Sequence, residues 1–190
     1  MDPTLAATLY CLLAGGVLLG WLRERAARTT TGAGEGFWPG TTSAPAAAHF
    51  AAAAATLLIT VAESVVEIRA DVSQSQSVLT GLSLLALLAA AIIEEVVFRG
   101  FAAPAWLAGG RLLTVIVAGS TVFALVHGFD LGTVHGRVSL AFAFVTSLGL
   151  YVARFNPLNP GRSLTPCFTA HIVRNLAVFG IKWAQGFVTW

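Results

Sequence analysis

Residues 92–101, IIEEVVFRGF, place two adjacent carboxylates and an arginine inside a run of Leu, Ala, Ile and Val. On a helix each residue turns its side chain by about 100°, so Glu95 and Arg99 share one face. Glu94 points about a quarter-turn away and shares its face with Phe98. An ion pair between Glu95 and Arg99 would leave Glu94 free, and a free carboxylate in an apolar setting suits general acid–base chemistry. The alternative is a purely structural Glu–Arg clamp between helices.

Two other stretches repeat the four-residue spacing. FALVH puts Phe123 and His127 on one helix face, and HIVRN does the same for His171 and Asn175. Imidazole, carboxylate and amide groups are the usual components of a hydrolytic site. The three stretches together therefore predict one site assembled from three helices.

The positions of these stretches in the sequence indicate how they could meet. Gly109–Gly110 lies midway between Glu94 and His127, so a turn there predicts an antiparallel helical hairpin with both side chains at one level. His171 lies close to the start of its helix. To reach the other two residues, the preceding segment 155–165, FNPLNPGRSLT, has to dip into the protein, or this helix has to start deeper than its neighbours.

The elements that carry these residues read as membrane helices. Of the 190 residues 56% are hydrophobic and 11% charged, and the mean hydropathy is +0.79. A soluble domain rarely has such a composition, so we predict an integral membrane protein with an all-α fold, a polytopic bundle of about six transmembrane helices. The apolar segments lie at about 4–22, 46–67, 78–101, 112–129, 138–154 and 166–186.

The distribution of arginines predicts the orientation of the bundle. Basic residues accumulate in short cytoplasmic loops, and the first span, which lacks a basic start, is interpreted as a retained anchor. With six alternating spans, six loop arginines lie inside and two outside, so both termini face outward. The composition, rich in Ala, Gly and Arg, favours a bacterial plasma membrane. The inner arginines are Arg23, Arg25, Arg28, Arg111, Arg154 and Arg162, and the outer ones are Arg69 and Arg137.

The motifs EExxxR, FxxxH and HxxxN, in this order and spacing, resemble those of the CAAX protease and bacteriocin-processing family. Its members are intramembrane endopeptidases related to the type II CAAX prenyl endopeptidases. The resemblance covers about residues 90–180, including FVTSLGLYVAR and SLTPCFTAHIVRN. The chain departs from the family pattern in the inserted-looking FNPLNPG and in Arg174, which stands where an apolar or small residue is expected.

The resemblance implies a division of roles among the site residues. Glu94 would be the general base acting on a water held between it and His127. His171 and Asn175 would donate hydrogen bonds to the developing oxyanion. The residues implied to support the site are Glu95, Arg99, Phe98 and Phe123. The same resemblance divides the chain into two N-terminal helices with a Gly/Thr/Pro-rich linker, residues 1–77, and a four-helix catalytic core, residues 78–190.

We expect no cofactor, with a divalent metal such as zinc as the alternative. The family has been described both as metal-dependent and as glutamate-dependent, and a metal here would be bound by Glu94, His127 and His171. The chain has no HExxH spacing, which would place two ligands one helical turn apart. Haem ligation by the two histidines would leave the adjacent carboxylates unexplained.

The expected partners are the lipid bilayer and a peptide or membrane-protein substrate. No nucleotide-binding glycine loop is present, and we expect no nucleic-acid partner. The alternative to an enzyme is an accessory or scaffold subunit of a larger membrane complex that retains this fold. The small extent of the chain outside the spans fits either reading.

Two glutamates in the second apolar span have two interpretations. Glu63 and Glu67 are four residues apart near the outer end of the second span, where they could form an interfacial pair close to Arg69. Alternatively Glu63 reaches Arg174 across helices, because charges inside a membrane usually pair with one another.

Overall fold

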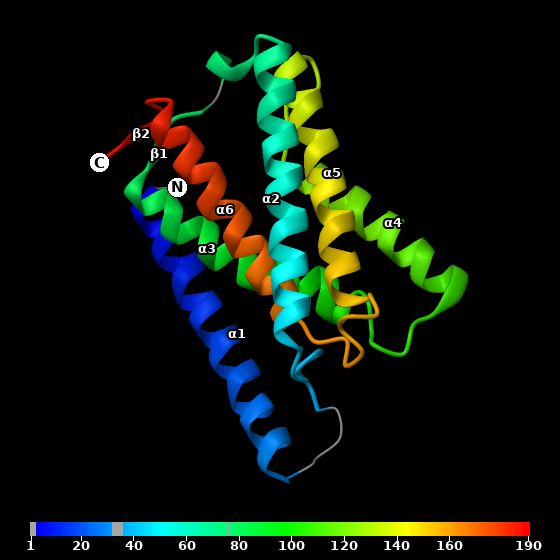
Figure 1. Ribbon diagram of the computed structural model, residues 1–190. Coiled ribbons are helices and arrows are strands. Elements are labelled where there is room, and N and C mark those ends of the chain that lie inside the picture. The colour runs from blue at the N-terminus through cyan, green and yellow to red at the C-terminus, as the bar shows by residue number, and fades with distance from the viewer. Residues whose placement is uncertain (1–2, 32–35, 76) are drawn as a thin grey trace.

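The computed structural model describes residues 3–31, 36–75 and 77–190. Within them the chain forms a bundle of six long helices (Figure 1), which confirms the predicted all-α fold. The helices are α1 Pro3–Thr31, α2 Ala46–Arg69, α3 Gly81–Glu94, α4 Gly109–Val126, α5 Val134–Arg154 and α6 Thr165–Ala184. Shorter elements are the 3₁₀-helix η1 Ser73–Ser75, the π-helix η2 Glu95–Phe101, and the strands β1 Leu79–Thr80 and β2 Val188–Thr189, which pair in parallel.

Four helical segments among the described residues are long and apolar enough to cross a membrane. They are α2, α4, α5 and the continuous segment formed by α3 and η2, Gly81–Phe101. The more polar α1 and α6 are not among the four. The prediction of an integral membrane helix bundle is thus confirmed, with four of the six helices meeting this criterion by length and composition.

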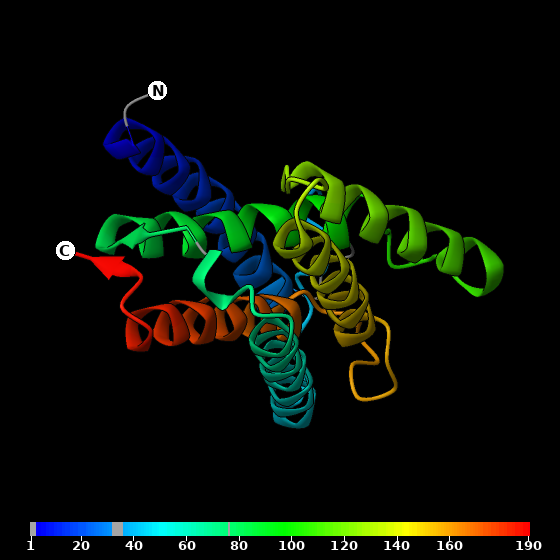
Figure 2. The same cartoon turned by 90° about the horizontal axis from the view of Figure 1, so that it is seen from above.

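Small side chains let α2 pack closely against its neighbours. Ala48, Ala52, Thr56 and Thr60 are buried at every fourth position and form one face of the helix. The helix α2 lies along α5 and α6 (Figures 1 and 2), the two helices that it contacts most extensively. Stripes of small residues at this spacing are typical of helix packing within membranes. The alanine-rich start of the second span therefore serves helix–helix contact.

The first helix joins the same hydrophobic core as the helices that follow. α1 packs along α3, and Trp21 is buried against Phe168 of α6, with the ring centroids 5.4 Å apart in an edge-to-face arrangement. The indole Nε1 donates a hydrogen bond to the carbonyl of Pro39 at 3.0 Å. Residues on both sides of position 77 therefore contribute to one core.

The segment before α6 is buried only in part, since Leu158 and Pro160 are exposed, so it does not dip into the protein as a whole. Asn159, Ser163 and Leu164 are all buried. The Asn159 side chain donates hydrogen bonds to three backbone carbonyls, and the Leu164 amide donates to the carbonyl of Gly40 at 3.0 Å. Gly40 has φ +62°, a conformation that favours glycine. These hydrogen bonds satisfy polar groups around the buried residues of the segment, as burial demands.

The connection between the third and fourth helices differs from the predicted hairpin. Residues 102–108 form the connection, Gly109 with φ +56° begins α4, and α4 packs chiefly along α5. The physical reason is a set of hydrogen bonds that ties this connection to the end of α5 and the loop after it. Arg154 donates to the carbonyls of Gly100 and Ala103, and Arg162 donates to those of Ala105 and Leu107.

Candidate active site

The helix that carries the two glutamates changes from α to π geometry at the site itself. α3 ends at Glu94 and η2 begins at Glu95, and the amide of Ala102 donates to the carbonyl of Val97, five residues earlier, at 2.9 Å. A π-turn widens the helix and frees carbonyl groups, and such turns are frequent at functional sites. One freed carbonyl, that of Phe98, accepts a hydrogen bond from the Tyr151 hydroxyl at 2.9 Å.

Glu95 and Arg99 form the ion pair that their spacing predicts. The Arg99 Nη1–Glu95 Oε1 distance is 3.1 Å, and both side chains are fully buried. Arg99 Nη2 also donates to the hydroxyl and the carbonyl of Ser147 at 2.6 and 3.3 Å. The guanidinium lies 4.5 Å from the ring centroid of Phe123 and 5.0 Å from that of Tyr151. These contacts hold Glu95 through Oε1, while among the described residues its Oε2 and Nε of Arg99 have no hydrogen-bond partner.

His171 reaches both glutamates from α6. Its Nδ1 lies 2.7 Å from Oε1 of Glu95, and its Nε2 lies 3.7 Å from Oε2 of Glu94. Since an ionised carboxylate only accepts hydrogen bonds, Nδ1 is the donor to Glu95. The hydrogen bond to Glu95 orients the ring and directs Nε2 toward Glu94.

Glu94 is the more accessible of the two carboxylates. Its side chain is 27% exposed, whereas that of Glu95 has no exposed surface. Neither carboxylate oxygen of Glu94 takes part in the Arg99 pair. The two neighbouring glutamates thus have different environments, one buried and paired, the other reachable from outside the bundle.

His127 lies beside the site at the C-terminal end of α4. Its Nδ1 is 2.7 Å from the carbonyl of Phe123, and its ring lies 4.7 Å from the Phe123 ring and stacks on Phe129 at 5.6 Å. The Phe123 ring is in turn 6.1 Å from that of His171. Within the described residues the ion-pair partner of Glu94 is His171, not His127. A water molecule that bridges Glu94 and His127 lies between the two side chains, so the proposed contact does not require them to lie within ion-pair distance.

The remaining predicted residues surround this centre. Asn175 is buried and donates from Nδ2 to the carbonyl of Leu87 in α3 at 2.9 Å, which leaves its second amide hydrogen available. Phe98 packs edge-on against Phe123 with the ring centroids 5.4 Å apart. All eight predicted residues therefore belong to one connected region formed by α3, η2, α4 and α6.

A metal ion does not fit the side chains as they are arranged. Across the described parts of the chain, no group of three or more His, Cys, Asp or Glu side chains is placed to hold one. Nδ1 of His171 is occupied by Glu95, and His127 does not join Glu94 within ion-pair distance.

Sequence reasoning missed two residues of the site, Ser147 and Tyr151. Both are fully buried on α5, one turn apart, and one binds Arg99 while the other binds the π-helix. A signal was present, because polar side chains four residues apart in an apolar span usually face the protein interior.

Arg174 follows His171 by three residues on α6, and its side chain contacts α2 and α5. Its Nη2 forms an ion pair with Oε2 of Glu63 in α2 at 2.8 Å, and its Nε donates to the hydroxyl of Thr146 at 3.2 Å. Of the two interpretations of Glu63, the pairing across helices is thus confirmed. The charge that departs from the expected pattern is balanced by a carboxylate outside the site.

A comparison with models of protein families identifies the family of this chain. The model of the Rce1-like family, type II CAAX prenyl endopeptidases, matches residues 76–177, more than half of the chain. The match contains every residue of the site described above. No curated protein and no solved structure matches the chain.

The helical membrane bundle and the family match define the class as a membrane-embedded protease. The chain belongs to the Rce1-like family of type II CAAX prenyl endopeptidases.

Proposed function

We propose that this protein is an intramembrane endopeptidase that hydrolyses a peptide bond with a water activated by Glu94. The observation that supports this most is the unequal state of two adjacent carboxylates. Glu95 is fully buried between Arg99 and His171, whereas Glu94 is partly exposed and has Nε2 of His171 at 3.7 Å. Two neighbouring carboxylates can take different roles, one structural and one catalytic, only when their environments differ.

In the proposed reaction Glu94 takes a proton from water as the water oxygen attacks the scissile carbonyl. The proton then passes to the departing amine, so that Glu94 serves first as base and then as acid. His127, whose Nε2 is not used by the Phe123 carbonyl, holds the same water. The tetrahedral intermediate collapses with cleavage of the C–N bond.

Stabilisation of the oxyanion is assigned to His171 and Asn175. His171 donates to Glu95 through Nδ1, so its Nε2 donates to the oxyanion in the imidazolium form of the ring, and Asn175 is held by Leu87 through one of its amide hydrogens. A preorganised donor of this kind contributes about 3 to 4 kcal/mol to transition-state stabilisation. Arg99 acts indirectly, because it fixes Glu95.

The substrate class is a membrane-associated or leader-type polypeptide in a bacterial plasma membrane. The four helical segments long and apolar enough to cross a membrane support a substrate of this class, because such polypeptides are present in or at the bilayer. An accessory subunit that merely keeps the fold is the competing proposal, and it gives Glu94 no chemical role.

A comparison of membrane proteomes tests the proposal. Cells producing wild-type protein or the Glu94→Ala variant would be compared by quantitative mass spectrometry, with Glu24→Gln as a matched control at the far end of α1. We expect at least one uncleaved membrane polypeptide to accumulate in Glu94→Ala cells alone. Identical proteomes in all three strains, at equal expression, would contradict the proposal.

A further inference from the structure

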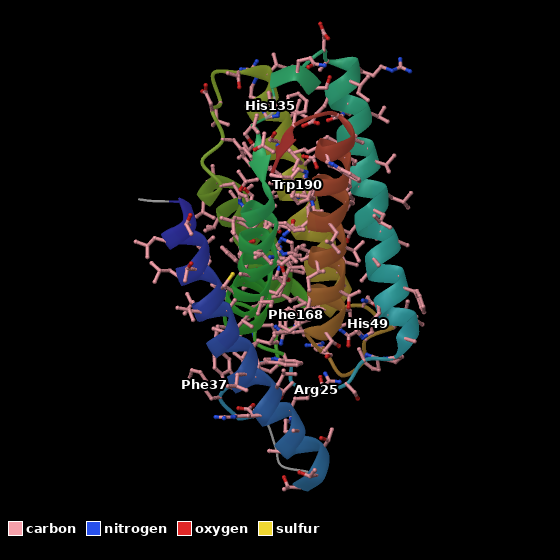
Figure 3. The ribbon with its side chains drawn as sticks, turned by 90° about the vertical axis from the view of Figure 1, so that its left-hand side faces the viewer. Arg25, Phe37, His49, His135, Phe168 and Trp190 are labelled. Carbon is pink, nitrogen blue, oxygen red and sulfur yellow. The ribbon has the colours of Figure 1, made fainter. Side chains whose placement is uncertain are left out.

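A pocket of about 510 Å³ lies where α1 ends, α2 begins and the connection from α5 to α6 passes. These segments meet at one end of the bundle (Figure 1), the end at which Figure 3 shows Arg25 and Phe37. Since α2 and α5 are among the segments able to cross a membrane, their ends lie close to the boundary between hydrocarbon and headgroups. The polar residues that line the pocket include Arg28, Thr41, Thr42 and Ser43.

Two arginines of α1 are held at this pocket by hydrogen bonds. Arg28 lines it and donates from Nη1 to the hydroxyl of Thr41 at 2.8 Å, and Arg25 donates from Nη1 to the carbonyl of Thr42 at 2.9 Å. The Arg25 guanidinium also lies 5.4 Å from the ring centroid of the buried Trp21. Both side chains are therefore positioned before a ligand arrives, which lowers the entropy cost of binding one.

The charge of these two arginines is not balanced by a carboxylate in the described part of the chain. No Asp or Glu side chain there lies within ion-pair distance of Arg25 or Arg28. The neighbouring Glu24 accepts a hydrogen bond from the amide of Trp38 instead, at 3.0 Å. A guanidinium has several N–H donors, and the contacts above use one on each arginine. Donors and positive charge thus remain for an anion.

The walls of the pocket are joined by hydrogen bonds between segments far apart in the sequence. Thr42 Oγ1 donates to the carbonyl of Gly161 at 2.7 Å, and Ser163 Oγ donates to the carbonyl of Thr42 at 2.6 Å. Ser163 is fully buried and directly precedes the start of α6. The pocket is therefore a built site rather than a stretch of flexible basic side chains.

Exposed aromatic side chains place this end of the bundle at the depth of the headgroups. Trp106 is 72% exposed and lines a hollow together with Phe37 and Trp38, a few residues before Thr41. Phe37 is exposed to the same extent. Tryptophan side chains gather at the interface between the hydrocarbon and the headgroups of a membrane. The anion present in quantity at this depth is the phosphate of a phospholipid.

We propose that this pocket binds the phosphate of an anionic phospholipid, with Arg28 and Arg25 as the donors. Arginine binds phosphate oxygens through paired N–H groups, and basic pockets at the ends of membrane helices favour anionic headgroups. A bound lipid would join α1 to the segments that precede α2 and α6. Occupancy should therefore stabilise the folded bundle, and this binding does not depend on the role of Glu94.

Lipid binding by the purified full chain tests the proposal. Phosphatidylglycerol and phosphatidylcholine with identical acyl chains would be titrated into the protein in a neutral detergent, with bound lipids counted by native mass spectrometry. We expect phosphatidylglycerol to bind about tenfold more tightly, and at saturation to raise the unfolding midpoint by about 5 °C more. Inorganic phosphate at the same concentration should not reproduce this shift. If it does, the ligand is free phosphate and the lipid assignment is wrong.

Three variants link the preference to the pocket. Arg28→Gln should lower the affinity for phosphatidylglycerol about tenfold, and Arg28→Lys, which keeps the charge but not the paired N–H groups, should lower it less. Arg111→Gln, the same charge loss at the exposed start of α4 and outside this pocket, should leave it unchanged. Equal affinity of the wild type for both lipids, or equal losses in Arg28→Gln and Arg111→Gln, would overturn the proposal.

Hydrogen–deuterium exchange of the wild type gives a second measurement that needs no variant to fold. Phosphatidylglycerol should slow amide exchange in residues 40–45 and 160–164, which form or adjoin the pocket, more than in residues 127–133 between α4 and α5. Equal slowing in both regions would show that the lipid acts on the bundle as a whole, and would contradict a site beside Arg28.

Discussion

At the scale of single residues, the site consists of one reactive carboxylate supported by a chain of buried contacts. Ser147 holds Arg99, Arg99 holds Glu95, and Glu95 orients His171 toward Glu94. Each link is a charge-assisted hydrogen bond away from water, where loss of one partner is costly. Residues that never contact a substrate therefore determine the geometry of those that do.

The two glutamates should differ sharply in their contribution to stability. Glu95→Gln leaves the buried guanidinium of Arg99 without its counter-charge, and we expect a loss of about 3 kcal/mol or more in the free energy of unfolding. Glu94→Gln, at a partly exposed position with no arginine partner, should cost below about 1 kcal/mol. Thermal unfolding of both variants in one detergent measures the difference. The opposite ordering would refute the assignment of roles.

Two buried serines give a matched test of the support for Arg99. Ser147→Ala removes the acceptor at 2.6 Å from Arg99 and should cost about 1.5 to 3 kcal/mol. Ser120 is equally buried, but among the described residues its hydroxyl has no hydrogen-bond partner. Ser120→Ala should therefore be neutral or slightly stabilising. Equal unfolding midpoints for the two variants would show that Ser147 gives Arg99 no support.

The four-residue spacing was enough to predict the Glu95–Arg99 pair, because residues four apart still lie on the same side of this π-helix. The partner of Glu94 was not predictable in the same way. It depends on how far α6 enters the bundle, which is set by the segment in which Asn159 and Leu164 are buried. Contacts between distant segments follow from packing, which spacing along one helix does not encode.

At the scale of the elements, the π-helix and α5 form one unit. Tyr151 binds the freed carbonyl of Phe98, and Arg154 binds those of Gly100 and Ala103. The positions of five helices were predictable to within a few residues because apolar segments and charged ends mark them, whereas α1 continues nine residues past the predicted end of its span, to Thr31. The π-turn and the path of α4 were not, since both depend on donors supplied by α5 and the loop after it.

A glycine in α4 allows this unit to form. A Cβ added at Gly119 would lie 2.2 Å from the Tyr151 hydroxyl, which its bond to Phe98 holds in place. Gly119→Ala should therefore displace Tyr151 and cost about 1 to 3 kcal/mol. Gly110→Ala is the control in the same helix, because open space surrounds that position and alanine favours helix there. Similar unfolding curves for the two variants would exclude this steric role.

At the scale of the whole molecule, the bundle has two chemically different ends. Arg25 lies at one end and His135 at the other (Figure 3). Two arginines counted in predicting the orientation, Arg154 and Arg162, bind backbone carbonyls within the protein, so they serve structure as well as topology. Composition was enough to predict a membrane bundle, but it could not reveal the pocket that Arg28 lines.

The orientation remains a prediction of the arginine distribution. With Arg25 and Arg111 in the cytoplasm, both termini lie on the outer side of the membrane. Alkaline phosphatase fused after Trp190 should then be active in a bacterial host, and a fusion placed after Arg111 should be inactive. The reverse pattern would invert the bundle and move the pocket that Arg28 lines to the outer side.

The most direct measurement compares cleavage rates of wild type and Glu94→Gln in proteoliposomes, with the polypeptide that accumulates in Glu94→Ala cells as substrate. Loss of the general base should lower the rate by about a hundredfold or more, while the unfolding midpoint stays within a few degrees of the wild type. A Glu94→Gln variant that cleaves this polypeptide at the wild-type rate would contradict the central claim that Glu94 activates the water.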